Sequence, residues 1–203
     1  MYLERLIEAF SSLPGISRRL ARNIVLNFVF KDDLLNALKD SFEEAVHRKK
    51  VCPGCGFLMD EKGCPICDDP ERERSSICVV PDPLTLYVFE ENSLWNGLYF
   101  VLGGLVDPSS GIAPSDLRIN DLVLFVKRII EDTERKKIEV CFAFDSTVEG
   151  DITVRLLLDA LKEVSAERLV LTKLAPLPSG ARVSSLDVEI LKSAFKNRKR
   201  LDE

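Results

Sequence analysis

Four cysteines in two pairs carry the clearest chemistry in this chain. They stand in Cys52-Pro53-Gly54-Cys55 and Cys64-Pro65-Ile66-Cys67, with eight residues between the pairs. Each Cys-x-x-Cys turn aims two thiolates at one point, and two such turns supply the four sulfurs of a tetrahedral zinc site. Four protein ligands leave no position open for water or substrate, so the pattern predicts one structural zinc per chain.

A disulfide framework and a redox pair are the alternatives to zinc. A disulfide framework belongs to an oxidising compartment, and a thioredoxin-like motif needs only one Cys-x-x-Cys beside a βαβ unit. We therefore favour zinc. The predicted ligands are Cys52, Cys55, Cys64 and Cys67.

A second group of candidate residues is acidic and follows the apolar segment 138–144. Asp145, Glu149 and Asp151 lie within seven residues. Carboxylates after a parallel strand can hold Mg²⁺, and acids at a helix start can simply cap the helix. Because one acid would suffice for a cap, we favour a third reading, in which the three acids recognise a basic partner.

The third candidate site is basic. The turn 13–16, which contains Gly15, separates two segments with helical apolar periodicity, and arginines occupy the first turns of the second segment. In a helix-hairpin-helix module, backbone N–H groups at such a helix start face a phosphate and basic side chains add attraction. Arginines near the positive end of a helix dipole are unfavourable unless a bound anion offsets their charge. Their presence here therefore favours phosphate contact over an ordinary helical hairpin. The predicted DNA contacts are Gly15, Arg18, Arg19 and Arg22.

Other reactive side chains have simpler interpretations. His47 is the only histidine, and we expect it at a solvated helix end. The basic run 48–50 beside the cysteines is a secondary candidate for nucleic-acid contact. Cys78 and Cys141 lie inside apolar runs, where cysteine behaves as a small hydrophobic residue, so we expect both in the core.

The pattern of apolar residues indicates which elements position these sites. Helical periodicity predicts helices at 2–11, from Ser17 through Phe28, and at 32–47. Beyond the charged linker from Asp68 to Arg74, short apolar runs alternate with further helical patterns. The runs are 77–80, 99–102, 138–144 and 169–171, and the helical patterns are 83–92, 117–135 and 150–163. Such alternation predicts an α/β domain with a mainly parallel sheet.

Composition limits the class of protein. The chain has 203 residues, 46% of them hydrophobic, and a formal net charge of −5. Residues 1–50 hold 9 Lys and Arg against 7 Asp and Glu, whereas residues 51–203 hold 19 against 26. A polyanion contact is therefore expected first at the N-terminal end. With no signal-peptide pattern and no run of 18 apolar residues, we expect a cytoplasmic protein without membrane contact.

The motifs together resemble a known family. The helix-hairpin-helix pattern, the four cysteines and the α/β pattern occur in this order with three further segments. These are Tyr99-Phe100-Val101-Leu102-Gly103-Gly104, Pro108-Ser109-Ser110-Gly111-Ile112-Ala113-Pro114 and Thr147-Val148-Glu149-Gly150. The chain resembles the RecR family of bacterial recombination mediators over essentially its full length. Its α/β part is similar to the Toprim domain of type IA topoisomerases and bacterial primases.

The resemblance implies a function and a domain organisation. It implies a non-enzymatic, DNA-binding protein of repair and recombination that forms a ring as a dimer or tetramer. It also implies work with RecO-like and RecF-like proteins to load recombinase on single-stranded DNA, with a RecO-like protein as the basic partner. The implied parts are a helix-hairpin-helix module (1–50), a zinc finger with linker (51–74), a Toprim-like domain (75–175) and a Walker-B-like segment with a helix (176–203).

Several positions depart from the family pattern. Ser17 replaces a second hairpin glycine, and Asp145 stands where the family commonly has Asn. Pro81 stands where the first Toprim strand usually ends in Glu, and segment 179–187 keeps only part of the usual glycine and acid pattern. Because a Toprim enzyme needs that Glu, Pro81 argues against phosphodiester chemistry.

Two alternative functions remain beside the mediator. They are a Mg²⁺-dependent Toprim enzyme using Asp145, Glu149 and Asp151, and a zinc-ribbon scaffold that binds only protein.

Overall fold

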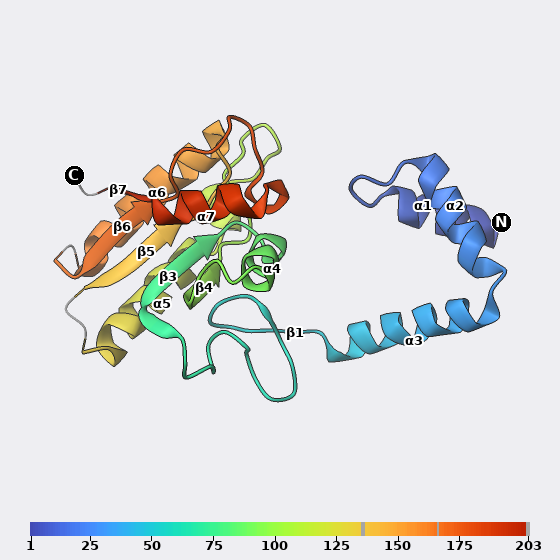
Figure 1. Cartoon of the computed structure of the whole chain (residues 1–203), viewed down its shortest axis with the longest axis horizontal. Coiled ribbons are helices and arrows are strands. Elements are labelled where there is room, and N and C mark those ends of the chain that lie inside the picture. Colours follow the sequence, from blue (N-terminus) through green and yellow to red (C-terminus); the bar gives the residue numbers. More distant parts are fainter. Residues whose placement is uncertain (135–136, 166, 202–203) are drawn as a thin grey trace. The chain divides into compact units, whose positions relative to one another are not determined.

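The chain forms two compact units, Met1–Lys49 and Lys50–Glu203. The computed structural model describes residues 1–134, 137–165 and 167–201, and Figure 1 labels its helices and strands. None of the helices within these ranges is long and apolar enough to cross a membrane.

The first unit consists of three helices. They are α1 (Tyr2–Ser11), α2 (Arg18–Val29) and α3 (Asp32–Arg48). The core is formed by Ile7, Ala21, Val25 and Phe28, and the rings of Phe10 and Phe28 lie 5.6 Å apart. The three helices predicted from apolar spacing are confirmed, and α2 buries Ala21, Val25 and Phe28, which recur at helical intervals.

The apolar face predicted for α3 is only partly used. Leu35 and Leu38 pack against the core of the first unit. Phe42 and Val46, further along α3, are 60% and 76% exposed. Helical periodicity therefore identified the helix, but it did not distinguish its packed first half from its exposed second half.

The second unit is built on a five-stranded sheet in the order β4-β3-β5-β6-β7. Its strands are β3 (Glu73–Val80), β4 (Gly97–Val101), β5 (Ile138–Phe142), β6 (Leu169–Lys173) and β7 (Lys199–Arg200). The first four run parallel, and β7 pairs with β6 in the antiparallel sense. The predicted α/β class with a mainly parallel sheet is therefore confirmed.

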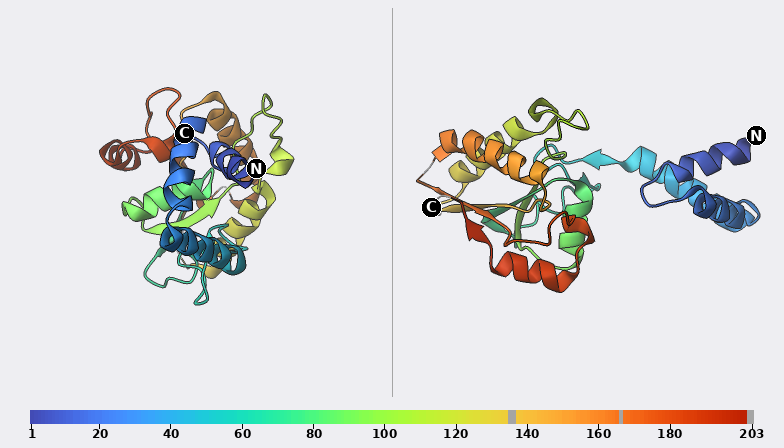
Figure 2. Two further views of the ribbon diagram at one scale, coloured as in Figure 1. Left: turned by 90° about the vertical axis from the view of Figure 1, so that its right-hand side faces the viewer. Right: turned by 90° about the horizontal axis from the view of Figure 1, so that it is seen from above.

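Helices cover both faces of this sheet, as the right-hand view of Figure 2 shows. They are α4 (Pro83–Glu91), α5 (Ile119–Asp132), α6 (Val148–Ser165) and α7 (Val188–Lys196). Side chains alternate between faces along each strand. Ile77 and Val79 pack in the cluster with α5 and α6, whereas Cys78 and Val80 pack in the cluster with α4 and α7.

The structure corrects parts of the predicted layout. The segment from Asp68 to Arg74 is not a free linker, because β3 already begins at Glu73 and Arg72 Nη1 donates 3.1 Å hydrogen bonds to Glu90 and to the Gly97 carbonyl. The predicted helix 117–135 spans Ile119–Asp132, and residue 135 lies outside the described residues. Two-residue strands are too short for a periodicity argument, so β7 and the hairpin of β1 (Lys50–Val51) and β2 (Leu58–Met59) were not predicted.

Candidate functional site

The four predicted cysteine ligands come together at one point of the second unit. Their sulfur atoms all lie within 4.8 Å of one another. Two of the Sγ···Sγ distances are 3.9 Å (Cys52 to Cys67) and 3.5 Å (Cys55 to Cys64). A tetrahedral ion with metal–sulfur bonds of about 2.3 Å has sulfur–sulfur edges of about 3.8 Å, whereas a disulfide bond is about 2.05 Å long. The cluster therefore has the dimensions of a four-thiolate metal site.

The pKa values of the thiols in this cluster depend strongly on one another. The hydrogen bond from Cys55 lowers the pKa of Cys67 to about 6, and the same contact together with burial raises the pKa of Cys55 well above its usual range. Burial also raises the pKa of Cys64 to about 11. One thiolate is therefore favoured at the expense of its neighbours. A bound cation would permit all four cysteines to be thiolates, which is what a closed metal site requires.

The segment that carries the cysteine cluster, residues 52–67, is called the cysteine knot below; backbone and side-chain contacts attach it to the sheet. The carbonyl of Cys55 accepts a 2.7 Å hydrogen bond from the Val101 amide. The guanidinium of Arg118 donates to the carbonyls of Pro53 and Gly54, at 3.0 and 3.2 Å, and to that of Val101 at 3.3 Å. Arg118 directly precedes α5. Its side chain therefore joins the first Cys-x-x-Cys turn, which we call the first knuckle, to the sheet and to the start of a helix.

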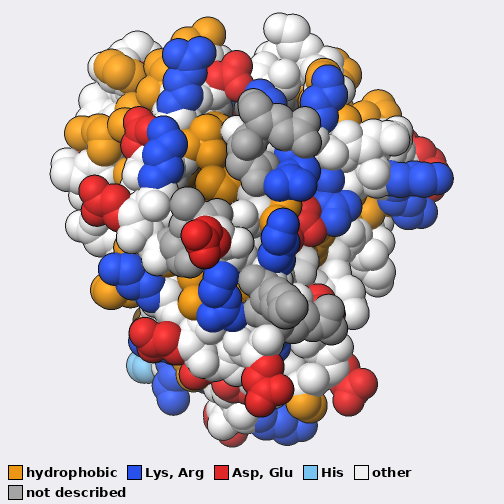
Figure 3. Space-filling model, turned by 90° about the vertical axis from the view of Figure 1, so that its left-hand side faces the viewer, with side chains coloured by type: hydrophobic (Ala, Val, Ile, Leu, Met, Phe, Trp, Pro, Cys, Tyr) orange, Lys and Arg blue, Asp and Glu red, His pale blue; other side chains and the backbone are white. Residues whose placement is uncertain are grey.

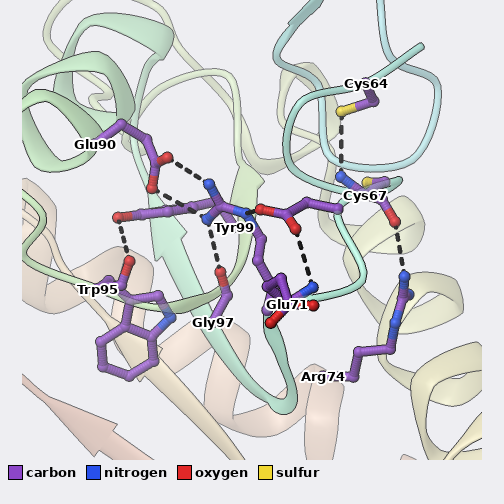
Figure 4. A network of polar contacts seen from close by, with 10 residues as sticks. Cys64, Cys67, Glu71, Arg74, Glu90, Trp95, Gly97 and Tyr99 are labelled. Atoms are coloured by element: carbon purple, nitrogen blue, oxygen red, sulfur yellow. Dashed lines mark hydrogen bonds and ion pairs between the residues drawn. The ribbon is translucent and has the colours of Figure 1, made fainter. Parts of the chain in front are cut away.

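A glycine makes room for this arginine. Gly56 has a φ of +82°, and a Cβ atom there would lie 2.1 Å from Arg118 Nη1. The second knuckle is held in a similar way from the start of β3, since Arg74 Nη2 donates to the Cys67 carbonyl at 3.0 Å (Figure 4). The Cys67 amide in turn donates to Cys64 Sγ at 3.4 Å. Spacing in the sequence indicated the ligands, but it did not indicate these two arginines.

The basic candidate residues lie at the start of α2 in the first unit. Ser17 caps this helix, because its side chain accepts a 3.2 Å hydrogen bond from the Leu20 amide. Arg18, Arg19 and Arg22 line one hollow of about 410 Å³, together with Glu4 and Ile7. The structure therefore brings the three arginines together around a space that is open to a ligand.

An acid that sequence reasoning missed belongs to this hollow. Glu4 forms an ion pair with Arg18, with Oε2 and Nη2 2.7 Å apart. Gly15 lies in the preceding turn at a φ of +78°, and a Cβ atom there would meet nothing within 4 Å. Gly15 is required by the backbone conformation of the turn, and it is not among the residues that line the hollow.

The acidic candidate residues follow β5, but they do not converge. Asp145 Oδ1 accepts a 2.7 Å hydrogen bond from the amide of Val183, and Asp151 Oδ1 pairs with Lys173 Nζ at 3.3 Å. Glu149 lies in the first turn of α6 and is half-buried. Within the described residues, the only group of three or more potential ligands close enough to hold a metal is the cysteine cluster.

Asp145 therefore has a structural task that the sequence did not reveal. Its loop also exchanges backbone hydrogen bonds with segment 180–183, since the Gly180 amide donates to the Ser146 carbonyl at 2.9 Å. These contacts fasten the C-terminal segment to the loop after β5. Asp145 and Asp151 also line a hollow of about 140 Å³ beside Lys173.

The remaining candidates have the positions expected of them. His47 is exposed in the last turn of α3, and the run 48–50 is exposed beside it. Cys78 and Cys141 are fully buried and face each other across β3 and β5. Pro81 directly follows β3, and the next residue, Asp82, caps α4 through the Thr85 amide at 2.8 Å.

Comparison with known proteins agrees with this architecture. Residues 75–174 match the Toprim domain family. The chain is 35% identical over 199 residues to recombination protein RecR of Bifidobacterium longum (strain DJO10A), covering 97% of this chain and 95% of the relative. It is 34% identical over 198 residues to recombination protein RecR of Rhodopseudomonas palustris (strain TIE-1), covering 97% and 94%. The protein of that name from Chelativorans sp. (strain BNC1) is 35% identical over 198 residues, with the same coverage.

Proposed function

Because the chain belongs to the RecR family of recombination proteins, we propose that it is a non-enzymatic mediator that binds DNA and promotes loading of a recombinase on single-stranded DNA. It works in the cytoplasm with RecO-like and RecF-like proteins. The observation that carries the DNA-binding part is the hollow lined by Arg18, Arg19 and Arg22 at the start of α2. Clustered guanidinium groups at a helix N-terminus suit a phosphate group, and they read no base sequence.

We assign the parts of the chain as the family resemblance implies. Residues 1–50 are the DNA-binding module, and 51–74 the zinc finger with the segment that leads into β3. The Toprim-like domain is 75–175, and the C-terminal segment is 176–203. The division into compact units after Lys49 supports the first boundary. Because the cysteines pack in one cluster with Tyr99 and Val101 of β4, the zinc finger acts as a rigid extension of the Toprim-like domain.

The DNA-binding proposal is tested by replacing Arg19 and Arg22 together with Ala. Binding to a labelled duplex is followed by fluorescence anisotropy over a series of salt concentrations. If both arginines neutralise phosphates, the slope of log K against log salt falls by about 1.8, and the loss is the same for unrelated sequences. Arg5→Ala, on α1 and outside the hollow, is the matched control. An unchanged slope in the double variant would exclude this hollow and direct attention to the run 48–50.

We propose zinc as the metal of the cysteine cluster, with Cys52, Cys55, Cys64 and Cys67 as its four ligands. The metal has a structural role only, since four thiolates leave no open position. Metal analysis of the purified protein should find one zinc per chain. Cys64→Ser should lose it and unfold the knot, while most of the α/β core remains. Metal-free protein with four accessible thiols would contradict the assignment.

We propose that Glu149 and Asp151 recognise a basic partner such as a RecO-like protein. Glu149→Ala should leave the fold, the zinc and DNA binding unchanged and should slow association with that partner, most at low salt. Stopped-flow mixing with the purified partner, at several salt concentrations, measures this association rate directly. Equal association rates for wild type and Glu149→Ala would exclude this loop as the contact.

Assembly into a ring dimer or tetramer would strengthen DNA binding. One monomer has a net charge of −5 and presents three arginines at the hollow at the start of α2, whereas several hairpins act together through multivalency. A mass measurement in solution, with and without DNA, tests this part of the proposal.

The alternative function is a Mg²⁺-dependent Toprim enzyme. Phosphodiester cleavage needs metal ions against both the attacking and the leaving oxygen. Here Pro81 replaces the usual Glu, and Asp145 is engaged with the Val183 amide. Magnesium-dependent nicking of plasmid DNA by the wild type, lost in Glu149→Ala, would favour the enzyme.

A further inference from the structure

The C-terminal end of the second unit is strongly basic, although residues 51–203 as a whole carry more acids than cations. The stretch from 190 to 201 contains no acid and holds five cations. They are Lys192, Lys196, Arg198, Lys199 and Arg200. Figure 3 views the side of the molecule on which β7 lies, and Lys and Arg side chains gather across the middle of it.

Two hollows adjoin each other beside this stretch, over the first residues of β3 and β5. Their volumes are about 410 and 520 Å³. Glu73, Ser76, Lys196 and Arg198 line both of them, so the two hollows form one continuous depression. We refer to it as the α7 groove, defined by these four residues together with Trp95 at one end and Lys137 at the other.

Contacts within the protein hold the Arg198 side chain in place at the edge of the α7 groove. Its Nη2 donates to Glu139 Oε2 at 2.8 Å, and its guanidinium lies 5.5 Å from the centre of the Trp95 ring. Glu139 also accepts a 2.9 Å hydrogen bond from Thr172 Oγ1. The charge of Glu139 is therefore compensated from within the protein, and Arg198 is held in place at the same time.

The two lysines of the groove are in a different situation. Lys137 and Lys196 are both exposed, and no ion pair to either is present in the part of the chain that the structure describes. Glu73, the other acid of the groove, accepts hydrogen bonds from the amide and hydroxyl of Ser75 at 3.1 and 2.7 Å. The lysine side chains therefore remain available for an anion, and Ser76, which lines the same hollow, adds a hydroxyl donor.

We propose that the α7 groove binds the phosphate backbone of single-stranded DNA. Several cations along one depression can contact successive phosphates of a strand, and cations with hydroxyl donors are typical backbone contacts. A single strand can bend into a depression between a helix and strand ends, whereas a stiff duplex presents a convex surface. This contact is separate from the arginines of α2, and it gives the second unit a DNA contact of its own.

The position of Trp95 makes the groove directly observable. Trp95 is the only tryptophan, it is half-buried, and it lines the groove next to Arg198. Its fluorescence therefore reports on this place alone. The full-length chain is titrated with an unlabelled thymidine oligonucleotide in the Arg19→Ala/Arg22→Ala background, which isolates the groove from the first unit.

We expect the oligonucleotide to change Trp95 emission saturably in that background. Lys137→Ala/Lys196→Ala should then weaken binding roughly 25-fold at 0.1 M salt and lower the single-strand salt slope by about 1.4, because two phosphate contacts are lost. Lys127→Ala, an exposed lysine of α5 outside both hollows, should leave the affinity within about twofold of its parent.

Three outcomes would overturn the proposal. The first is Trp95 emission that does not respond to the oligonucleotide, and the second is an equal response in the lysine variant. The third is a tighter response to a hexaglutamate peptide or to a hairpin duplex than to the single strand, which would assign the groove to an acidic protein segment or to duplex DNA.

Discussion

The guanidinium Nη2 of Arg118 lies 3.0 Å from the carbonyl oxygen of Pro53, which is 65 residues earlier in the chain. Arg118 also lies over the Phe100 ring, 4.7 Å from its centre, and pairs with Asp121 at 3.0 Å. The side chain is 26% exposed, so its hydrogen bonds to the knuckle are only partly in competition with water. The first Cys-x-x-Cys turn is thus held by the sheet as well as by its metal ligands.

We predict that Arg118→Met loosens the cysteine knot. Losing the charge-assisted hydrogen bonds to these three carbonyls costs about 2 kcal/mol, which corresponds to roughly 30-fold more frequent opening of the first Cys-x-x-Cys turn. Transfer of metal to a coloured chelator should accelerate accordingly, and amide exchange at residues 53–56 should rise. Arg118→Lys should recover only part of the effect, because an ammonium cannot reach three carbonyls. Wild-type rates in Arg118→Met would show that the knot is held by metal and backbone alone.

We predict that Glu4→Gln strengthens DNA binding. Glu4 neutralises Arg18 in the hollow at the start of α2, so its removal frees one cation for a phosphate. The duplex salt slope should steepen by about 0.9, and affinity at 0.1 M salt should rise up to roughly eightfold. Glu8→Gln, another exposed acid of α1 that lies outside the hollow, should change the slope much less. If both variants bind alike, only net charge matters and the hollow is not the phosphate site.

We predict different roles for two acids of the loop after β5. Asp145→Ala leaves the amide of Val183 without its acceptor, and because Val183 is fully buried this costs about 1–3 kcal/mol of unfolding free energy. Asp145→Asn keeps an oxygen acceptor and should restore most of the loss. Glu149→Ala should change stability by less than about 0.5 kcal/mol. Urea unfolding compares the three, and a stable Asp145→Ala would show that segment 180–183 is held by other contacts.

We predict that the contribution of Glu139 to stability disappears in acid. Burial raises the pKa of this carboxyl, but the hydrogen bonds from Arg198 and Thr172 outweigh burial and hold the pKa below its usual value of 4.5. A lowered native-state pKa means that the contribution is present above about pH 4.5 and is lost as the pH falls through the lowered value.

The corresponding experiment compares Glu139→Gln with wild type across pH. The variant should be less stable by about 1–3 kcal/mol at pH 7, and the difference should vanish toward pH 3. Glu163→Gln, an exposed acid on α6, is the control and should show no such pH dependence. A difference that stays constant from pH 7 to pH 3 would mean that side-chain shape, and not charge, is what Glu139 contributes.

The sequence alone determined those features that depend on local spacing. Each Cys-x-x-Cys turn brings its own two sulfurs together, two such turns are typical of one metal site, and the cysteine cluster was correctly predicted. Alternating apolar runs and helical patterns determined the α/β class, since periods of two and 3.6 residues are set by backbone geometry. The order of the motifs identified the family, and the relatives confirm it.

Only the tertiary structure decided which distant side chains meet. Glu4 and Arg18 are 14 residues apart, Asp145 and Val183 are 38 apart, and Arg198 and Glu139 are 59 apart. Short strands such as β7 and the exposed second half of α3 belong to the same class of features. A spacing rule cannot find them, because a local pattern specifies which face of an element is apolar. Which charges oppose each other is determined only when the elements pack and water is excluded between them.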